Sequence, residues 1–366
     1  MPNRFDQLAV AQPDRLLSVF AAPPVYPLLR RPMGWMGEAV TFAALRMLVR
    51  DSVVGCNDLP CPADQLASCI AAPGERQLLP ARWFVGLNKN TLHDDPTTAS
   101  AAAARIIREK TGCNPDQYLK QKGFLNGQYR PAFHPDGSMF AAGLGMTAAE
   151  AAQFIAIMNR DGLLDPDELP VGCYGMATVR LGENTVAVAA GWFEEPQTLK
   201  EEIRSLASKT EPVLQPAENL FYYNGKVPEF CGKDFLPRGR RRFPSVPELV
   251  GGAGSLHGIG GEISRLFFGT DDQKAVIRCI EEDGRSSLTF GYDGWITARC
   301  PSGVYAGKAV SMDESHFCGL LMNLDGVSRT EIRLAKTDGG LLLETKPESD
   351  SDEEFSLLFA DAEGIA

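Results

Sequence analysis

The stretch "GLGMTAAEAAQFIAIMNRDG", residues 143–162, has the pattern that decides how the first half of the chain folds. Thr147 and Glu150 have the spacing of a capping box, in which each side chain caps a backbone N–H of the first turn. An apolar face at helical spacing follows, made of Ala151, Phe154, Ile155 and Met158. Gly162 ends the pattern. The sequence predicts a helix from Thr147 to Asp161 that buries this face against a sheet.

The residues before this helix also read as helical, in three shorter segments. "EAVTFAALRMLVRD" (38–51) has apolar residues at helical spacing, and "TTASAAAARIIREKTG" (97–112) is alanine-rich and stops at a glycine. "NPDQYLKQKG" (114–123) has Asn114 as N-cap and a proline at the first helical position. We expect helices to dominate up to residue 162.

After this helix the apolar residues recur at every second position, as in a strand, and no longer at helical spacing. Residues 175–193 predict a hairpin of two strands, and residues 198–209 a short helix with a second capping box, Thr198 and Glu201. "EISRLFFG" and "KAVIRCIEE" predict another hairpin, turned by "TDDQ". We expect strands 175–193 and 262–282 to form one antiparallel sheet.

From residue 287 onward the chain has strand-like segments separated by glycine-containing turns, with no helical period. The predicted fold class is therefore α+β, an antiparallel sheet flanked by helices, followed by a C-terminal small all-β domain. The predicted domains are residues 1–284, the α+β domain, and residues 285–366, a small antiparallel barrel or sandwich. A protease cut near "EEDGRSS" (281–287) is expected to release the second domain intact.

Composition narrows the class of function. The chain has 366 residues and a net charge of −11, which argues against a nucleic-acid partner, because binding phosphates needs clustered Lys and Arg. Nine cysteines, an odd and scattered number, predict reduced thiols. With no signal peptide and no long apolar run, we expect a cytoplasmic protein without a membrane partner. No P-loop, dinucleotide fingerprint or zinc set is present, so we expect no cofactor and no metal.

Several residues are candidates for a catalytic or binding site. Ser205 in "SLASK" precedes a lysine by four residues, and an amine one helical turn away can take a serine's hydroxyl proton. Tyr222 in "YYN" matches a Y-x-N pattern. Ser255 in "GAGSLHG" comes nearest to a nucleophile elbow but misses its spacing. His257 lies among glycines, which allow the backbone to approach a ligand closely.

Three segments together resemble the class C β-lactamase-like serine hydrolases, which include esterases and penicillin-binding proteins. Residues 104–124 resemble the helices after the family's Y-x-N motif, and residues 143–164 its glycine-led helix. Residues 250–280 resemble the strand that carries the H-x-G motif and the hairpin beside it. The resemblance implies Ser205 or Ser255 as nucleophile, Tyr222 as proton shuttle and His257 as a substrate or oxyanion contact. The implied substrate-binding residues are Tyr223, Gly258, Gly260 and Gly261.

The chain also departs from this family. The segment just before residue 105, where Y-x-N is expected, reads "DDPTTAS", and no S-x-x-K appears in residues 1–95. The opening region is also short for the family's first strands. Two hypotheses follow. The chain is a serine hydrolase or acyltransferase acting on a small ester or amide, or it is a degenerate member that lost its nucleophile and binds a ligand or protein partner without catalysis.

Overall fold

The structure of the chain is a computed structural model. It describes residues 3–33, 36–54, 106–113, 115–124, 128–129, 144–167, 169, 171, 174–193, 195–215, 221, 223, 225–238, 244, 246, 249, 262–281, 284–300, 303–324, 329–347 and 354–362. The chain divides into two compact units, unit 1 (Met1–Gln215) and unit 2 (Pro216–Ala366). Each unit is a structure with its own core, and each is described by itself.

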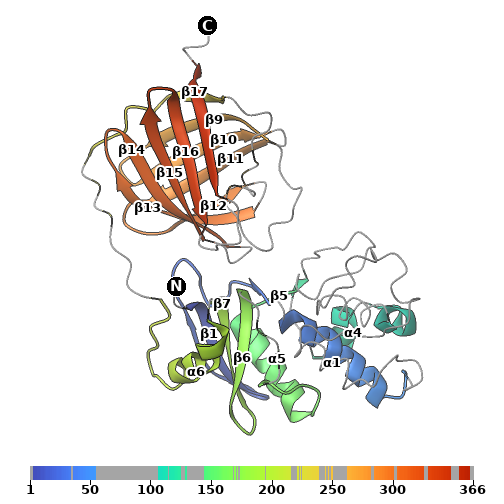
Figure 1. The fold of residues 1–366 in the computed structure, drawn as a ribbon. Coiled ribbons are helices and arrows are strands. Elements are labelled where there is room, and N and C mark those ends of the chain that lie inside the picture. Colours follow the sequence, from blue (N-terminus) through green and yellow to red (C-terminus); the bar gives the residue numbers. More distant parts are fainter. Residues whose placement is uncertain are drawn as a thin grey trace. The chain divides into compact units, whose positions relative to one another are not determined.

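Unit 1 contains an antiparallel sheet with the strand order β2-β1-β7-β6 (Figure 1). Its strands are β1 (Arg4–Gln12), β2 (Arg15–Ala21), β6 (Tyr174–Gly182) and β7 (Thr185–Trp192). The predicted hairpin at 175–193 is therefore confirmed. The opening residues supply the other two strands of this sheet, so the expectation that helices dominate up to residue 162 does not hold for β1 and β2.

Helices pack on both faces of this sheet (Figure 1). Helix α5 (Ala148–Arg160) covers one face, where its apolar residues share a core with Ala9 of β1 and Val188 of β7. Helix α6 (Pro196–Ala207) covers the other face, where Leu199 and Ile203 share a core with Leu8 of β1. Because side chains alternate across a strand, β1 contributes to both cores.

The two helix-capping predictions have different outcomes. At α5 the capping box is present: Glu150 N donates to Thr147 Oγ1 (3.1 Å) and Thr147 N donates to Glu150 Oε2 (3.0 Å). The capping box predicted at Thr198 is wrong. Helix α6 begins two residues earlier, at Pro196, and Thr198 Oγ1 donates instead to Glu202 Oε1 (2.6 Å). Proline fits the first turn because that turn leaves backbone N–H groups without partners.

The remaining elements of unit 1 are helices and one small sheet. Helix α1 (Met36–Arg50) contacts α4 (Pro115–Gln121), and residues 106–111 are also helical. Strands β3 (Arg31–Pro32), β5 (Leu144–Met146) and β4 (Gln128–Tyr129) pair in that order. None of the helices in the described part of the chain combines the length and the apolar character that a membrane span needs.

A buried charge cluster joins β1 to β3. Asp6 and Arg31 are both fully buried, and Arg31 Nη2 lies 3.0 Å from Asp6 Oδ2. Arg4 Nε lies 3.4 Å from the other carboxylate oxygen, which also accepts a hydrogen bond from Gln215 Nε2 (2.9 Å). The cluster therefore joins the first strand, the strand before α1 and the last residue of the unit.

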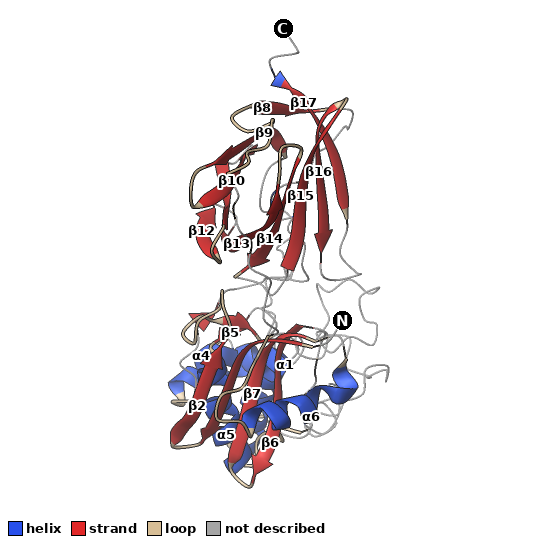
Figure 2. Cartoon of the chain, turned by 90° about the vertical axis from the view of Figure 1, so that its left-hand side faces the viewer, coloured by secondary structure: helices blue, strands red, loops and turns tan. Residues whose placement is uncertain are grey.

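Unit 2 is a ten-stranded sheet with the order β11-β10-β9-β8-β17-β16-β15-β14-β13-β12 (Figure 2). A parallel bridge between Gly291 of β11 and Lys308 of β13 closes the sheet into a barrel. The strands are β8 (Asp234–Pro237), β9 (Ile263–Thr270), β10 (Lys274–Glu281), β11 (Gly284–Gly291), β12 (Ile296–Cys300), β13 (Gly303–Met312), β14 (His316–Asn323), β15 (Arg329–Thr337), β16 (Gly340–Pro347) and β17 (Phe355–Asp361).

Phenylalanine side chains fill much of the barrel interior. Phe268 lies with its ring centroid 5.1 Å from that of Phe230 and 5.0 Å from that of Phe317, and Phe290 lies 5.2 Å from Phe317. All four are buried. Aromatic pairs at these distances and tilted angles add to the stabilisation from burial alone.

The structure corrects the predicted domain boundary. Strands β9 and β10 pair with β8 and β11 in the unit 2 sheet, so strands 175–193 and 262–282 do not share one sheet. The division falls between Gln215 and Pro216, not between residues 284 and 285. A cut near residues 281–287 would fall in the β10–β11 hairpin of the barrel, so the structure gives no reason to expect the release of an intact fragment there.

Closure of the barrel leads to a first prediction, that Gly307→Ala destabilises unit 2 by about 1 to 3 kcal/mol. A Cβ atom on Gly307 would lie 2.1 Å from the backbone oxygen of Thr289, so β11 and β13 would have to separate. The control is Gly294→Ala, where an added Cβ meets nothing within 4 Å. Urea unfolding of both variants is the measurement. Equal stability of the two variants would contradict this explanation of the closure.

Candidate functional site

Residues 225–233 run across one end of the barrel, the end at which β9, β11, β13, β15 and β17 finish. Glu229 N donates to Glu314 O (2.9 Å) in the turn between β13 and β14. Gly232 N donates to Phe268 O of β9 (2.9 Å). This segment is therefore fixed to opposite sides of the barrel mouth by backbone hydrogen bonds.

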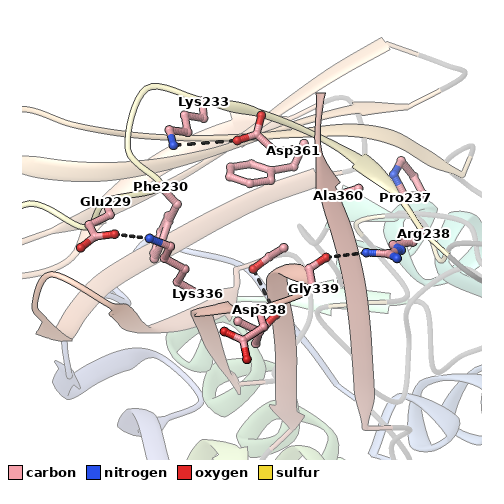
Figure 3. Close-up of a pocket in the computed structure, with 13 residues that line it drawn as sticks. Glu229, Phe230, Lys233, Pro237, Arg238, Lys336, Asp338, Gly339, Ala360 and Asp361 are labelled. Atoms are coloured by element: carbon pink, nitrogen blue, oxygen red, sulfur yellow. Dashed lines mark hydrogen bonds and ion pairs between the residues drawn. The ribbon is translucent and has the colours of Figure 1, made fainter. Parts of the chain in front are cut away.

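Beside this segment lies a cavity of about 650 Å³, which we call the rim pocket (Figure 3). Segment 225–233, strand β8, the β15–β16 turn and the end of β17 form its wall. The lining residues are Glu229, Phe230, Lys233, Phe235, Pro237, Arg238, Lys336, Thr337, Asp338, Gly339, Gly340, Ala360 and Asp361. Its volume lies within the range of roughly 300 to 1,000 Å³ that is usual for small-molecule sites.

Charged side chains of both signs line the rim pocket. Lys336 pairs with Glu229 across its edge, and this ion pair holds the pKa of Glu229 below its ordinary value. Arg238 Nη1 donates to Gly339 O (2.9 Å), which fixes the β15–β16 turn to the end of β8 (Figure 3). Lysine and arginine on one hand and glutamate and aspartate on the other can bind ligand groups of opposite charge.

Lys233 is the cation of the pocket whose ion pair is loosest. Its Nζ lies 3.8 Å from Asp361 Oδ2, beyond hydrogen-bond distance, and its side chain is 47% exposed. An ion pair at this separation and exposure contributes little to stability. Lys233 can therefore turn toward a ligand without a large cost to the fold.

Ser205, a predicted nucleophile, lies on α6 in unit 1. Its side chain is exposed, and within the described part of the chain its hydroxyl has no hydrogen-bond partner. Its carbonyl accepts a bond from Ser208 Oγ (2.8 Å). A serine becomes a nucleophile when a neighbouring base takes its proton. Among the described residues, no base is hydrogen-bonded to the Ser205 hydroxyl.

Tyr223, a predicted substrate-binding residue, belongs to unit 2 and packs on the barrel. Its ring stacks on Tyr292, with centroids 4.5 Å apart, and Phe221 meets the same ring edge-on at 5.7 Å. Tyr292 is almost fully buried, and burial raises the pKa of its phenol. Tyr223 therefore has a packing role that accounts for its position, and it does not lie in the same unit as Ser205.

The other predicted site residues lie outside the described residues. They are Tyr222, Ser255, His257, Gly258, Gly260 and Gly261. Their roles stay predictions.

Sequence reasoning missed the rim pocket, because its charged residues come from two segments that are separated by nearly 100 positions of chain. Glu229 and Lys336 belong to no motif, and the glycine-containing turns after residue 287 predict only that strands are separated there. Only strand pairing, such as Phe235 opposite Asp361, brings β8 beside β17. No local pattern in the sequence marks this site.

The described residues contain no group of three or more His, Cys, Asp or Glu side chains placed to hold a metal ion. The cysteines that the structure describes carry free thiols: Cys113, Cys231, Cys279, Cys300 and Cys318. Burial raises the pKa of the Cys318 thiol to about 11, which keeps it protonated at neutral pH.

No protein-family model and no curated protein sequence matches this chain. Among solved structures, a protein from Bacillus anthracis named as a 6-aminohexanoate-dimer hydrolase is similar at 13% identity and a TM-score of 0.37, over 56% of this chain and 77% of that one. A penicillin-binding protein homologue from Pyrococcus abyssi, an octamer, is similar at 9% identity and a TM-score of 0.36, over 97% of this chain and 96% of that one. At these scores neither likeness assigns a fold or an activity to this chain.

Proposed function

We propose that this chain is a binding protein whose rim pocket takes a small zwitterionic amide, such as a dipeptide. One observation carries the proposal. A cavity of about 650 Å³ has cationic, anionic and apolar side chains on its wall, which are the three kinds of group that a dipeptide needs. Binding without catalysis is the second of the two functions that the sequence predicts. The rim pocket, however, is not among the sites that the sequence predicts.

The wall groups suggest how such a ligand would lie. Its carboxylate would meet Lys233 and Arg238, since a guanidinium and an ammonium both donate strong hydrogen bonds to carboxylates. Its ammonium would meet Asp338, which is exposed on the β15–β16 turn. An apolar side chain of the ligand would lie against Phe235 and Pro237.

The surroundings of Ser205 favour ligand binding over catalysis as the function of this chain. Its hydroxyl is hydrogen-bonded to no base among the described residues, so the role of nucleophile has no support from such a bond there. The hydrolase prediction that uses Ser255, Tyr222 and His257 stays a prediction. The same holds for a cytoplasmic location and for the expectation of neither a nucleic-acid nor a membrane partner.

Isothermal titration of the full chain with glycyl-leucine tests this proposal. We expect saturable binding, and we expect Lys233→Met to weaken it about tenfold, equivalent to about 1.4 kcal/mol. N-acetyl-glycyl-leucine, which lacks the ammonium, and glycyl-leucine amide, which lacks the carboxylate, should each bind more weakly than the zwitterion.

The control variant is Lys346→Met. Lys346 is also an exposed lysine of unit 2, but it lies near the end of β16 that is remote from the β15–β16 turn. It should bind glycyl-leucine as the unchanged protein does. No saturable binding of the dipeptide, or equal weakening by both substitutions, would contradict the proposal.

A further inference from the structure

The hairpin between β13 and β14 brings a serine, a histidine and an aspartate into one hydrogen-bonded row. Asp313 Oδ2 lies 2.6 Å from His316 Nδ1, and Ser311 Oγ lies 3.4 Å from His316 Nε2. The two ring nitrogens of the imidazole are therefore engaged on opposite sides, one by a carboxylate and one by a hydroxyl. This is the order of contacts in a Ser-His-Asp catalytic triad, which is recognised by geometry and not by sequence position.

The backbone of the hairpin fixes this row. A bulge between Ala309 and Ser311 shifts the register of β13 against β14, so that Ser311 pairs with Cys318. Bulges of this kind re-aim side chains and are frequent next to active sites. Val310, the residue at the bulge, is 43% exposed and lies next to Ser311 in the chain.

Asp313 is also held in place by backbone groups, apart from its contact with the imidazole ring. Its Oδ1 accepts hydrogen bonds from Ser315 N (2.7 Å) and His316 N (2.9 Å). These bonds, with that from the Ser315 backbone foremost, lower the pKa of Asp313 to about 2. The carboxylate is thus ionised at neutral pH. It fixes a proton on Nδ1, which leaves Nε2 free to act as the base toward Ser311.

We propose that Ser311, His316 and Asp313 form a hydrolytic site for small activated esters, distinct from the rim pocket. The Ser311–His316 distance falls within the looser range that nucleophile–base pairs show before substrate binds. The side chains of His316 and Asp313 are 42% and 43% exposed, so an ester in solution can reach them. A site this open excludes water poorly, so it suits esters whose leaving group needs little stabilisation.

The reaction proceeds in two balanced steps. Ser311 Oγ attacks the ester carbonyl carbon while its proton moves to His316 Nε2. The carbonyl–oxygen bond to the alcohol then breaks, and the alcohol leaves with that proton. Water attacks the resulting acyl-serine, gives one proton to His316 Nε2 and releases the carboxylic acid, and the proton returns to Ser311. Asp313 keeps its charge throughout and stabilises the imidazolium.

Two probes test the proposal on the full chain, p-nitrophenyl acetate for turnover and an alkyl fluorophosphonate for labelling. We expect peptide mass spectrometry to find the phosphonyl group on Ser311. Ser311→Ala should abolish that adduct, and His316→Gln should lower ester turnover about 100-fold, the lower end of what a positioned base contributes. Far-UV circular dichroism checks that each variant is folded, and His316→Gln serves as a second test of the site if Ser311→Ala does not fold.

The control is Ser264→Ala. Ser264 is an exposed serine of β9 in the same barrel, and its hydroxyl donates to a backbone carbonyl, that of Ile280 (3.0 Å). Its replacement should change neither labelling nor turnover. An adduct on Ser205 or Ser255 instead, no adduct at all, or unchanged turnover in Ser311→Ala would overturn the proposal. Dipeptide binding in the rim pocket is measured separately, so the failure of one proposal does not affect the other.

Discussion

Arg31→Met is expected to destabilise unit 1 by about 3 to 5 kcal/mol, because it leaves a buried carboxylate without its main partner. Asp6 and Arg31 have no exposed surface, and their ion pair is 3.0 Å long. After the substitution Asp6 keeps Arg4 at 3.4 Å and Gln215 at 2.9 Å, which places the expected loss toward the lower end of that range. Methionine preserves much of the volume of the lost side chain. The expected loss of stability therefore comes from the unpaired charge of Asp6 and not from a cavity.

The neighbouring residue provides a matched control for this prediction. Arg30 pairs with Glu150 at 3.3 Å, but the two side chains are 36% and 27% exposed. Because solvent screens such a pair, Arg30→Met should cost less than about 1 kcal/mol. Urea unfolding followed by tryptophan fluorescence is the measurement, since residues 1–215 contain Trp35, Trp83 and Trp192. Similar losses for the two substitutions would show that burial does not decide the strength of the pair.

The elements that the sequence predicted are those whose cause is local. The capping box of Thr147 and Glu150 lies within four residues of chain, and its hydrogen bonds are present in α5. The predicted hairpin turn "TDDQ" is equally local, because Asp271 Oδ1 accepts from the backbone N–H groups of Gln273 and Lys274. A pattern that carries its own hydrogen bonds can be recognised without knowing the rest of the fold.

The assignment of strands to sheets could not be predicted in this way. Leu8 of β1 pairs with Ala189 of β7, and Leu236 of β8 pairs with Ala360 of β17. The partners in each pair lie more than 100 residues apart, and an alternating apolar pattern does not identify which strand lies beside which. The predicted domain boundary was wrong for this reason, because β9 and β10 were assigned to the first sheet.

The candidate sites also show this difference between local and long-range causes. The rim pocket depends on long-range pairing and leaves no trace in the local sequence. Ser311, Asp313 and His316 lie within six residues, yet no motif in the sequence marks any of them. Their alignment depends on the register shift between Ala309 and Ser311, which no residue pattern marks. Conversely, a short pattern predicts Ser205 as a site residue and the family resemblance implies Tyr223. In the structure Ser205 is exposed on a helix, and Tyr223 packs against Tyr292.

Phe154→Ala is expected to destabilise unit 1 by about 3 to 5 kcal/mol, through the lost burial of the ring and the cavity it leaves. Phe154 is 2% exposed on α5, and it belongs to the core that this helix forms with β1 and β7. The predicted apolar face is confirmed, since Ile155 and Met158 are fully buried beside it. The sheet that receives this face is the four-stranded sheet of unit 1.

Helix α5 supplies its own control in Ile157, which is only half-buried on the same helix. Ile157→Ala also removes an apolar side chain but leaves a smaller cavity, so it should cost clearly less than Phe154→Ala under the same urea titration. Alanine favours the helix more than either residue does, so a weakened helix cannot explain a large loss. A loss below about 1 kcal/mol in Phe154→Ala would mean that the core re-forms around the missing ring. In that case β1 and β7, which present small side chains such as Ala9 and Ala190 to α5, would have to move toward the helix.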